Sequence, residues 1–364
     1  MGRVRLQLLT AAAILAGCAS APPATPPTSP ADARAMIDRS LPRNLADRGG
    51  WLNDIYAAFT VLTIQPSREN VCAVASVIQQ ESGFQVDPVI PKLGAIAAAE
   101  IDSRAARAHV PLVIVHGVLD LKSTDGRTYA QRIDQARTEK TLSDIYEDFI
   151  AGVPLGRTLF DDKNPIRTRG PMQVNVAFAE QFAAAAPYPY PVTRSIADEV
   201  FTRRGSIYFG VAHLLDYRAP YDDYLFRFAD YNAGQYASRN AAFQHAVTVA
   251  SGIALDTDGV LKPRAEDSAA PGATELALRA LAARLGMSDA VIHAALEQDR
   301  TRSFETSAVY VRVFELADQA SGSAVPRALV PSISLRGPKI RRHLTTEWYA
   351  QRVDQRFKRC LETR

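Results

Sequence analysis

The stretch from residue 71 to residue 84, Val-Cys-Ala-Val-Ala-Ser-Val-Ile-Gln-Gln-Glu-Ser-Gly-Phe, constrains the fold of this chain more than any other. Apolar side chains recur there every three or four residues, at Val71, Val74, Ala75 and Ile78. This spacing predicts a helix with one buried face. The next position on that face is Glu81, and Gly83 is of the residue type that commonly ends helices. The pattern therefore predicts a carboxylate at the end of a buried helical face.

Two effects act on a carboxylate at this position. The negative end of the helix dipole and partial burial both disfavour its charged form. A carboxyl group that keeps its proton near neutral pH is suited to general acid catalysis. The sequence thus makes Glu81 a candidate catalytic acid, with an ordinary solvated glutamate at a helix end as the alternative.

The first 17 residues are typical of an export signal. A basic start is followed by an apolar run that is too short to span a membrane, and then by small residues. The segment Leu15-Ala16-Gly17-Cys18 resembles a bacterial lipobox, which implies that Cys18 is lipidated and becomes the mature N-terminus. A plain signal peptide with a chance cysteine is the alternative.

Residues 18–32 are rich in Pro, Ala, Ser and Thr, which predicts an extended tether between the lipid and the folded part. No aspartate follows Cys18, and by resemblance to Gram-negative lipoproteins this implies an anchor at the periplasmic face of the outer membrane. The formal charge of +3 falls to +1 when Arg3 and Arg5 leave with the signal, so charge gives no argument for a nucleic-acid partner. The 6 histidines lack metal-ligand spacing, and we expect neither a metal nor a cofactor.

The cysteines predict a covalent link between distant parts of the chain. Of 3 cysteines, Cys72 and Cys360 remain when Cys18 is set aside for lipidation. An even pair in an oxidising compartment favours a disulfide. We predict a bridge from the C-terminal helix to the helix that carries Glu81, with two separate buried thiols as the alternative.

Three short motifs then follow one another along the chain, with a helix predicted over residues 204–215 between the second and the third. They are Glu81-Ser82-Gly83-Phe84, Gly170-Pro171-Met172-Gln173 and Tyr231-Asn232-Ala233-Gly234. In this order they resemble the soluble lytic transglycosylases and goose-type lysozymes, and the resemblance covers about residues 51–245. The mature chain as a whole also resembles an uncharacterised family of proteobacterial lipoproteins with a domain of unknown function.

The lysozyme-like resemblance implies a function and a partner. Glu81 would be the acid/base of a murein lytic transglycosylase, which cleaves the β-1,4 bond between N-acetylmuramic acid and N-acetylglucosamine of peptidoglycan strands and forms 1,6-anhydro ends. The residues that would bind or border the substrate are Ser82, Met172, Gln173, Tyr231 and Asn232. The alternatives are a helix-end cap for Ser82, a core position for Met172 and a structural role for Asn232.

Two departures from the family pattern matter. The family has a few tens of residues at most between the first two motifs, whereas this chain has residues 82–169. We predict a helical insertion of about 70 residues, roughly 92–162, over or beside the cleft. Asp230 replaces a small residue, and because adjacent helical residues point about 100° apart we expect it to be solvated and not a second catalytic carboxylate. A groove filled by the insertion would make the protein a non-catalytic murein-binding or scaffold lipoprotein, which is the alternative function.

The expected fold is mainly α. A lysozyme-like helical domain over residues 33–250 contains the insertion, and a helical C-terminal extension over residues 251–364 packs on its core. Helices of this extension are predicted over residues 275–285, 288–298, 304–320 and 345–361. Residues 112–115 form a short apolar run that fits either a strand or a buried helix.

Overall fold

The computed structural model describes residues 28–152, 164–262 and 270–362, except 339 and 341. This part of the chain is mainly helical, as predicted, with two short antiparallel strand pairs. The predicted signal, Cys18 and the first part of the tether lie outside the described residues. Within the described ranges, no helix combines the length and the apolar character that crossing a membrane requires.

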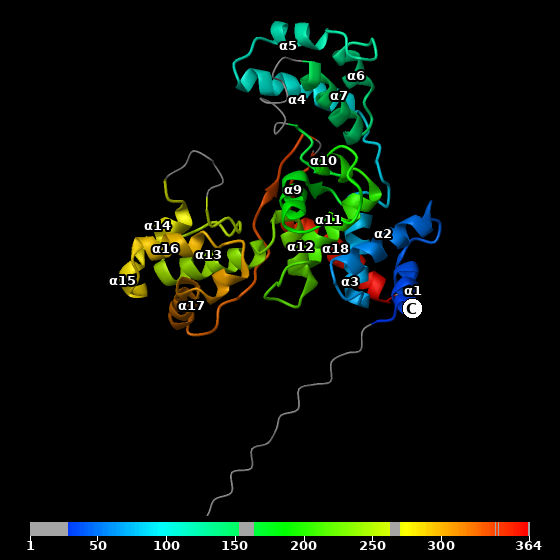
Figure 1. The fold of residues 1–364 in the computed structure, drawn as a ribbon. Coiled ribbons are helices and arrows are strands. Elements are labelled where there is room, and N and C mark those ends of the chain that lie inside the picture. The colour runs from blue at the N-terminus through cyan, green and yellow to red at the C-terminus, as the bar shows by residue number, and fades with distance from the viewer. Residues whose placement is uncertain (1–27, 153–163, 263–269, 339, 341, 363–364) are drawn as a thin grey trace, which may run out of the picture.

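The central bundle is the group of helices in the middle of Figure 1. It consists of α1 (Pro30–Ser40), α2 (Arg48–Val61), α3 (Arg68–Glu81), α9 (Val176–Ala185), α10 (Ile196–Glu199), α11 (Arg203–Leu215), α12 (Tyr224–Ala233) and α18 (Thr346–Glu362). Strands β1 (Thr168–Arg169) and β2 (Val174–Asn175) form a hairpin on it, in which Thr168 pairs with Asn175. The side chains of these helices and Val174 of β2 share one hydrophobic core.

Helix α3 is more deeply buried than its sequence pattern predicts. Every residue from Val71 to Ile78 is buried, including Ser76 and Val77 on the side opposite the apolar stripe. The reason is that α1, α11 and α18 all pack against α3. The residues around Glu81 are therefore held by a helix that is surrounded by protein.

The insertion occupies the upper end of Figure 1 and contains α4 (Leu93–Arg107), α5 (Leu112–Leu119), α6 (Tyr129–Gln135) and α7 (Glu139–Gly152). It has a small core of its own, and Gly94 allows α4 to pack against the backbone of residues 133 and 134. The run at 112–115 lies in a helix, but this helix buries no residue, so the expected buried segment is absent. Val113 is 78% exposed.

A second cluster of helices follows the central bundle in sequence and packs a separate core. It consists of α13 (Ala237–Ser251), α14 (Ala273–Ala280), α15 (Ala282–Leu285), α16 (Asp289–Leu296), the 3₁₀ helix η2 (Arg302–Thr306) and α17 (Ala308–Ser321). Ser288 caps the start of α16, and Gly286 follows the last residue of α15 in the left-handed conformation. The predicted helix over residues 304–320 corresponds to α17, but its first residues lie in the 3₁₀ helix η2.

Helix α18 returns from the second cluster to the central bundle. Strand β3 (Ser334–Leu335) pairs with β4 (Leu344–Thr345), which leads directly into α18. The helix buries Tyr349, Val353 and Phe357, which lie on one side, between α3 and α12. The end of the chain thus completes the same core that its first helices begin.

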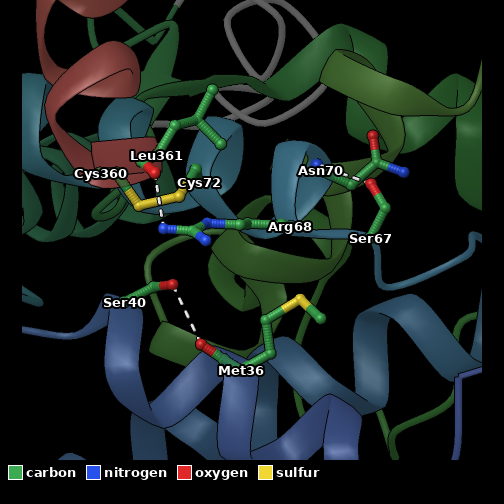
Figure 2. The surroundings of a disulfide bond; sticks show 8 residues. All are labelled: Met36, Ser40, Ser67, Arg68, Asn70, Cys72, Cys360 and Leu361. Atoms are coloured by element: carbon green, nitrogen blue, oxygen red, sulfur yellow. Dashed lines mark hydrogen bonds between the residues drawn. A yellow bond between two sulfur atoms is a disulfide. The ribbon is translucent and has the colours of Figure 1, made fainter. Parts of the chain in front are cut away.

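The predicted disulfide between Cys72 and Cys360 is present and joins α3 to α18 (Figure 2). Beside it, the Arg68 guanidinium donates a hydrogen bond of 2.5 Å to the carbonyl oxygen of Leu361. The prediction of a link between the C-terminal helix and the helix of Glu81 is confirmed.

Candidate active site

Glu81 is the last residue of α3, where the helix emerges from the bundle and leaves the side chain partly exposed. Ser67 caps the start of this helix, and Gly83 turns the chain with a φ of 60° just after its end. The carboxyl oxygen Oε1 of Glu81 accepts a hydrogen bond of 2.5 Å from the Tyr349 hydroxyl of α18. The Glu81 side chain is therefore accessible to solvent, while the Tyr349 hydroxyl holds its carboxyl group in place.

Tyr231 of α12 lies next to this pair. Its side chain is buried, and its hydroxyl donates a hydrogen bond of 2.7 Å to the carbonyl oxygen of Met172. Burial raises the pKa of Tyr231 well above its ordinary value, and the nearby charge of Glu81 raises it further. Tyr231 thus connects the end of α3 with the turn between β1 and β2, which is the second of the three sequence motifs.

The conformation of this turn depends on two glycines. Gly170 has a φ of 72°, and a Cβ there would lie 2.1 Å from the carbonyl oxygen of Val200. Gly210 of α11 faces Met172, and a Cβ would lie 2.4 Å from the methionine sulfur. Met172 is completely buried, so its side chain forms the floor beneath the turn and offers no surface to a ligand.

Gln173, predicted to offer its amide to a substrate, already has partners on both amide atoms. Its Nε2 donates to Oε2 of Glu139, the first residue of α7, at 3.0 Å. Its Oε1 accepts from the Thr168 hydroxyl at 3.0 Å. The insertion therefore contacts the side chain that the family pattern assigns to sugar binding.

The side chains of Ser82 and Asn232 form hydrogen bonds within the fold. The Ser82 hydroxyl donates to the carbonyl oxygen of Ile78, which closes the last turn of α3. Asn232 accepts a hydrogen bond of 2.7 Å from the Thr346 hydroxyl at the start of α18. Neither side chain bonds to Glu81 among the described contacts.

The expectation that Asp230 is solvated is wrong. Its side chain is 0% exposed and accepts hydrogen bonds from four donors: the hydroxyls of Tyr217 and Tyr221 and the backbone N–H groups of Tyr236 and Ser238. Burial raises the pKa of Asp230, although the hydrogen bonds oppose this effect. The residue points away from Tyr231, as the helical geometry requires, but the segments on both sides of α12 cover it.

His213 of α11 lies on the other side of Tyr231. Its Nε2 lies 3.2 Å from the carbonyl oxygen of Tyr231, and its Nδ1 is buried without a hydrogen-bond partner among the described residues. Burial between the rings of Phe178 and Tyr231 lowers the pKa of His213 to about 4. The imidazole is therefore neutral near pH 7.

Two residues at the site were missed by the sequence analysis, Tyr349 and Glu139. Both come from segments that no motif covers, and only the packing of α18 and α7 brings them to the site. The apolar stripe of α18 places Tyr349 on its buried side, so the sequence contained one signal for this tyrosine, namely its helical position.

These observations define a mainly helical protein with a glutamate at a buried helix end, bound by a tyrosine from the last helix. The chain matches the family model described as "Protein of unknown function (DUF1615)" over residues 44–363, and it belongs to that family. It is also similar to "Uncharacterized protein YaiW" of Escherichia coli (strain K12), with 48% identity over 356 residues, which cover 97% of each chain. The description of this family states no function, and no solved structure matches the chain.

Proposed function

We propose that this protein is a murein lytic transglycosylase that uses Glu81 as its acid/base. One observation carries the proposal. Glu81 is partly exposed at the end of α3, and Tyr231 links its surroundings to the turn of Gly170 and Met172. All three sequence motifs therefore lie around one carboxyl group.

In the first step, the Glu81 carboxyl would protonate the glycosidic oxygen between N-acetylmuramic acid and N-acetylglucosamine. The acetamido oxygen of the muramoyl residue attacks its own anomeric carbon as the glycosidic bond breaks, which gives a cyclic oxazolinium. The substrate group thus takes the place of a second carboxylate. The full burial of Asp230 agrees with a reaction that does not use this residue as a base for water.

In the second step, the Glu81 carboxylate would take the proton of the muramoyl 6-hydroxyl. The 6-oxygen then attacks the anomeric carbon, opens the oxazolinium and closes the 1,6-anhydro ring, while the acetamido group is restored. Glu81 ends the cycle protonated, as it began. The products are one strand that ends in a 1,6-anhydro-muramoyl residue and one strand that begins with N-acetylglucosamine carrying a free 4-hydroxyl.

We further propose that the protein works at the periplasmic face of the outer membrane, anchored through a lipidated Cys18. The tether would let the folded part reach peptidoglycan strands while the lipid stays in the membrane. Metabolic labelling with a fatty acid, compared between wild type and Cys18→Ala, tests the anchor. Label on the Cys18→Ala protein would contradict it.

The direct test is digestion of purified murein, with the products weighed by mass spectrometry. Wild type should release anhydro-muropeptides, and Glu81→Gln, which keeps the size of the side chain, should lower the rate by about 10³-fold or more. Anhydro products at the wild-type rate from Glu81→Gln would disprove the role of Glu81. Hydrated ends would instead indicate a hydrolase of the lysozyme type.

A second function is favoured by the contact between Gln173 and Glu139. Because both amide atoms of Gln173 are engaged, a sugar would have to displace Glu139 of the insertion and the Thr168 hydroxyl to use them. In this alternative the protein is a non-catalytic murein-binding or scaffold lipoprotein. Sedimentation with murein, without released products from either wild type or Glu81→Gln, would favour it.

A further inference from the structure

We infer that Tyr349 is a positioning residue for Glu81, because its hydroxyl determines which carboxyl oxygen delivers the proton to the substrate. This inference rests on the proposed function and extends it to a helix that none of the three motifs covers. The observation behind it is the 2.5 Å hydrogen bond from the Tyr349 hydroxyl to Oε1 of Glu81.

The hydrogen bond from Tyr349 gives the two carboxyl oxygens of Glu81 different roles. A tyrosine hydroxyl that donates to Oε1 occupies this oxygen as an acceptor, so the acidic proton of a neutral Glu81 resides on Oε2. Burial raises the pKa of Tyr349 well above its ordinary value, and Glu81 and Tyr231 raise it further, so the phenol keeps its proton and remains a donor. Oε2 is then the oxygen that carries the proton.

The same bond also serves the second half of the reaction. When Glu81 has given its proton away, the hydroxyl donates to a carboxylate, and such charge-assisted bonds are stronger than neutral ones. Tyr231 does not replace this donor, because its own hydroxyl is bonded to the carbonyl oxygen of Met172. Tyr349 thus bonds directly to Glu81, whereas the hydroxyl of Tyr231 bonds to the backbone of Met172.

The position of Tyr349 is fixed by both ends of α18. At the start of the helix, the Thr346 hydroxyl donates to Asn232 of α12. At its end, the disulfide of Cys360 joins it to α3. Tyr349 itself is only 5% exposed, so its ring has no freedom to turn away from Glu81. A helix anchored at both ends therefore presents one hydroxyl to the carboxyl group.

Among the described residues, titratable groups on two elements near the end of α3 also act on Tyr349. Tyr231 of α12 and Arg356 of α18 both act on Tyr349, and the Arg356 charge lowers its pKa while Tyr231 raises it. Neither group changes in the test below, so a shift in the titration of Glu81 is assigned to the hydroxyl that is removed.

The test is Tyr349→Phe, which removes the hydroxyl and keeps the buried ring. Because the lost donor stabilised the carboxylate, the protonated form of Glu81 should persist to higher pH. We expect kcat on murein to fall about tenfold with KM unchanged, and the alkaline limb of the pH–rate profile to move up by roughly one pH unit. Tyr310→Phe, at a half-buried tyrosine that packs against the second cluster, is the control and should change neither quantity.

A second measurement does not depend on turnover. The carboxyl carbon of Glu81, assigned by its loss in Glu81→Gln, can be titrated by NMR in wild type and in Tyr349→Phe. A midpoint at higher pH in the variant supports the inference, and an unchanged midpoint overturns it. A slower enzyme with an unchanged pH profile also overturns it, since that is the result of a purely structural role. If wild type releases no anhydro products, the proposed function fails, while the titration still decides whether Tyr349 acts on Glu81.

Discussion

Asp230 offers a sharp test of the packing around the third motif. Its two carboxyl oxygens each accept a fixed backbone donor: Oδ2 bonds to the N–H of Tyr236 at 3.0 Å, and Oδ1 bonds to the N–H of Ser238 at 2.7 Å. In Asp230→Asn, one of the two oxygens becomes an NH₂ group. Whichever way the amide turns, one backbone N–H faces another donor.

The magnitude follows from this geometry. The hydroxyls of Tyr217 and Tyr221 can rotate and accept from an amide, but the backbone N–H groups cannot move. A buried N–H without an acceptor costs about 1–3 kcal/mol, and the bond it made is lost as well. We therefore expect Asp230→Asn to lower the free energy of unfolding by about 2–4 kcal/mol. For a cooperatively unfolding unit of about 150–250 residues, this loss of stability corresponds to a fall in melting temperature of roughly 5–15 °C.

Thermal and urea unfolding, followed by circular dichroism, measure this loss. Asp222→Asn is the control, because Asp222 is exposed in the same region and should change stability by less than about 0.5 kcal/mol. A loss below about 1 kcal/mol in Asp230→Asn would refute the reasoning. It would mean that the segment around Tyr236 and Ser238 adapts to the amide.

Three other changes give distinct outcomes. Replacing both Cys72 and Cys360 by Ala removes a link across a sequence separation of 288 residues and should lower the free energy of unfolding by about 2–5 kcal/mol, seen as a lower melting temperature. Glu139→Ala removes the hydrogen bond between the insertion and the Gln173 amide nitrogen and should raise murein binding about threefold or more in sedimentation. The pKa of about 4 for His213 lies below its ordinary 6.5, so the unfolded chain takes up the proton first. Stability from His213 is present above pH 6.5 and decreases by up to about 3 kcal/mol as pH falls to 4, and His213→Phe should remove this slope in urea titrations.

A control or a contradicting result is available for each of these changes. A reducing agent should lower the melting temperature of wild type but not that of the double alanine variant. Identical wild-type melting curves with and without the reducing agent would contradict the role of the bridge. Glu139→Gln keeps an acceptor for Gln173 and should bind murein as wild type does. An equally steep pH dependence in wild type and His213→Phe would show that another group titrates.

Local patterns in the sequence predicted the helices and several of their ends, because capping residues and apolar spacing act over short distances. The disulfide was predictable because only two cysteines remained to pair. The contact of Tyr349 with Glu81 was not predictable, since it joins residues 268 positions apart and depends on the packing of α18. The burial of Asp230 was missed for a similar reason, because helical geometry gave its direction but not the segments that cover it.

The central bundle is built from segments that lie far apart in the sequence, and this determines the order in which the parts of the protein can fold. Helices α1, α2 and α3 precede the second cluster in the sequence and α18 follows it, whereas the second cluster contains only neighbouring segments. A growing chain can therefore complete the second cluster while α3 still lacks the surface of α18, since contacts between distant segments form late. A copy that stops short of residue 346 has neither Tyr349 nor a partner for Cys72. The surroundings of Glu81 therefore form only after α18 has been synthesised and has packed against α3.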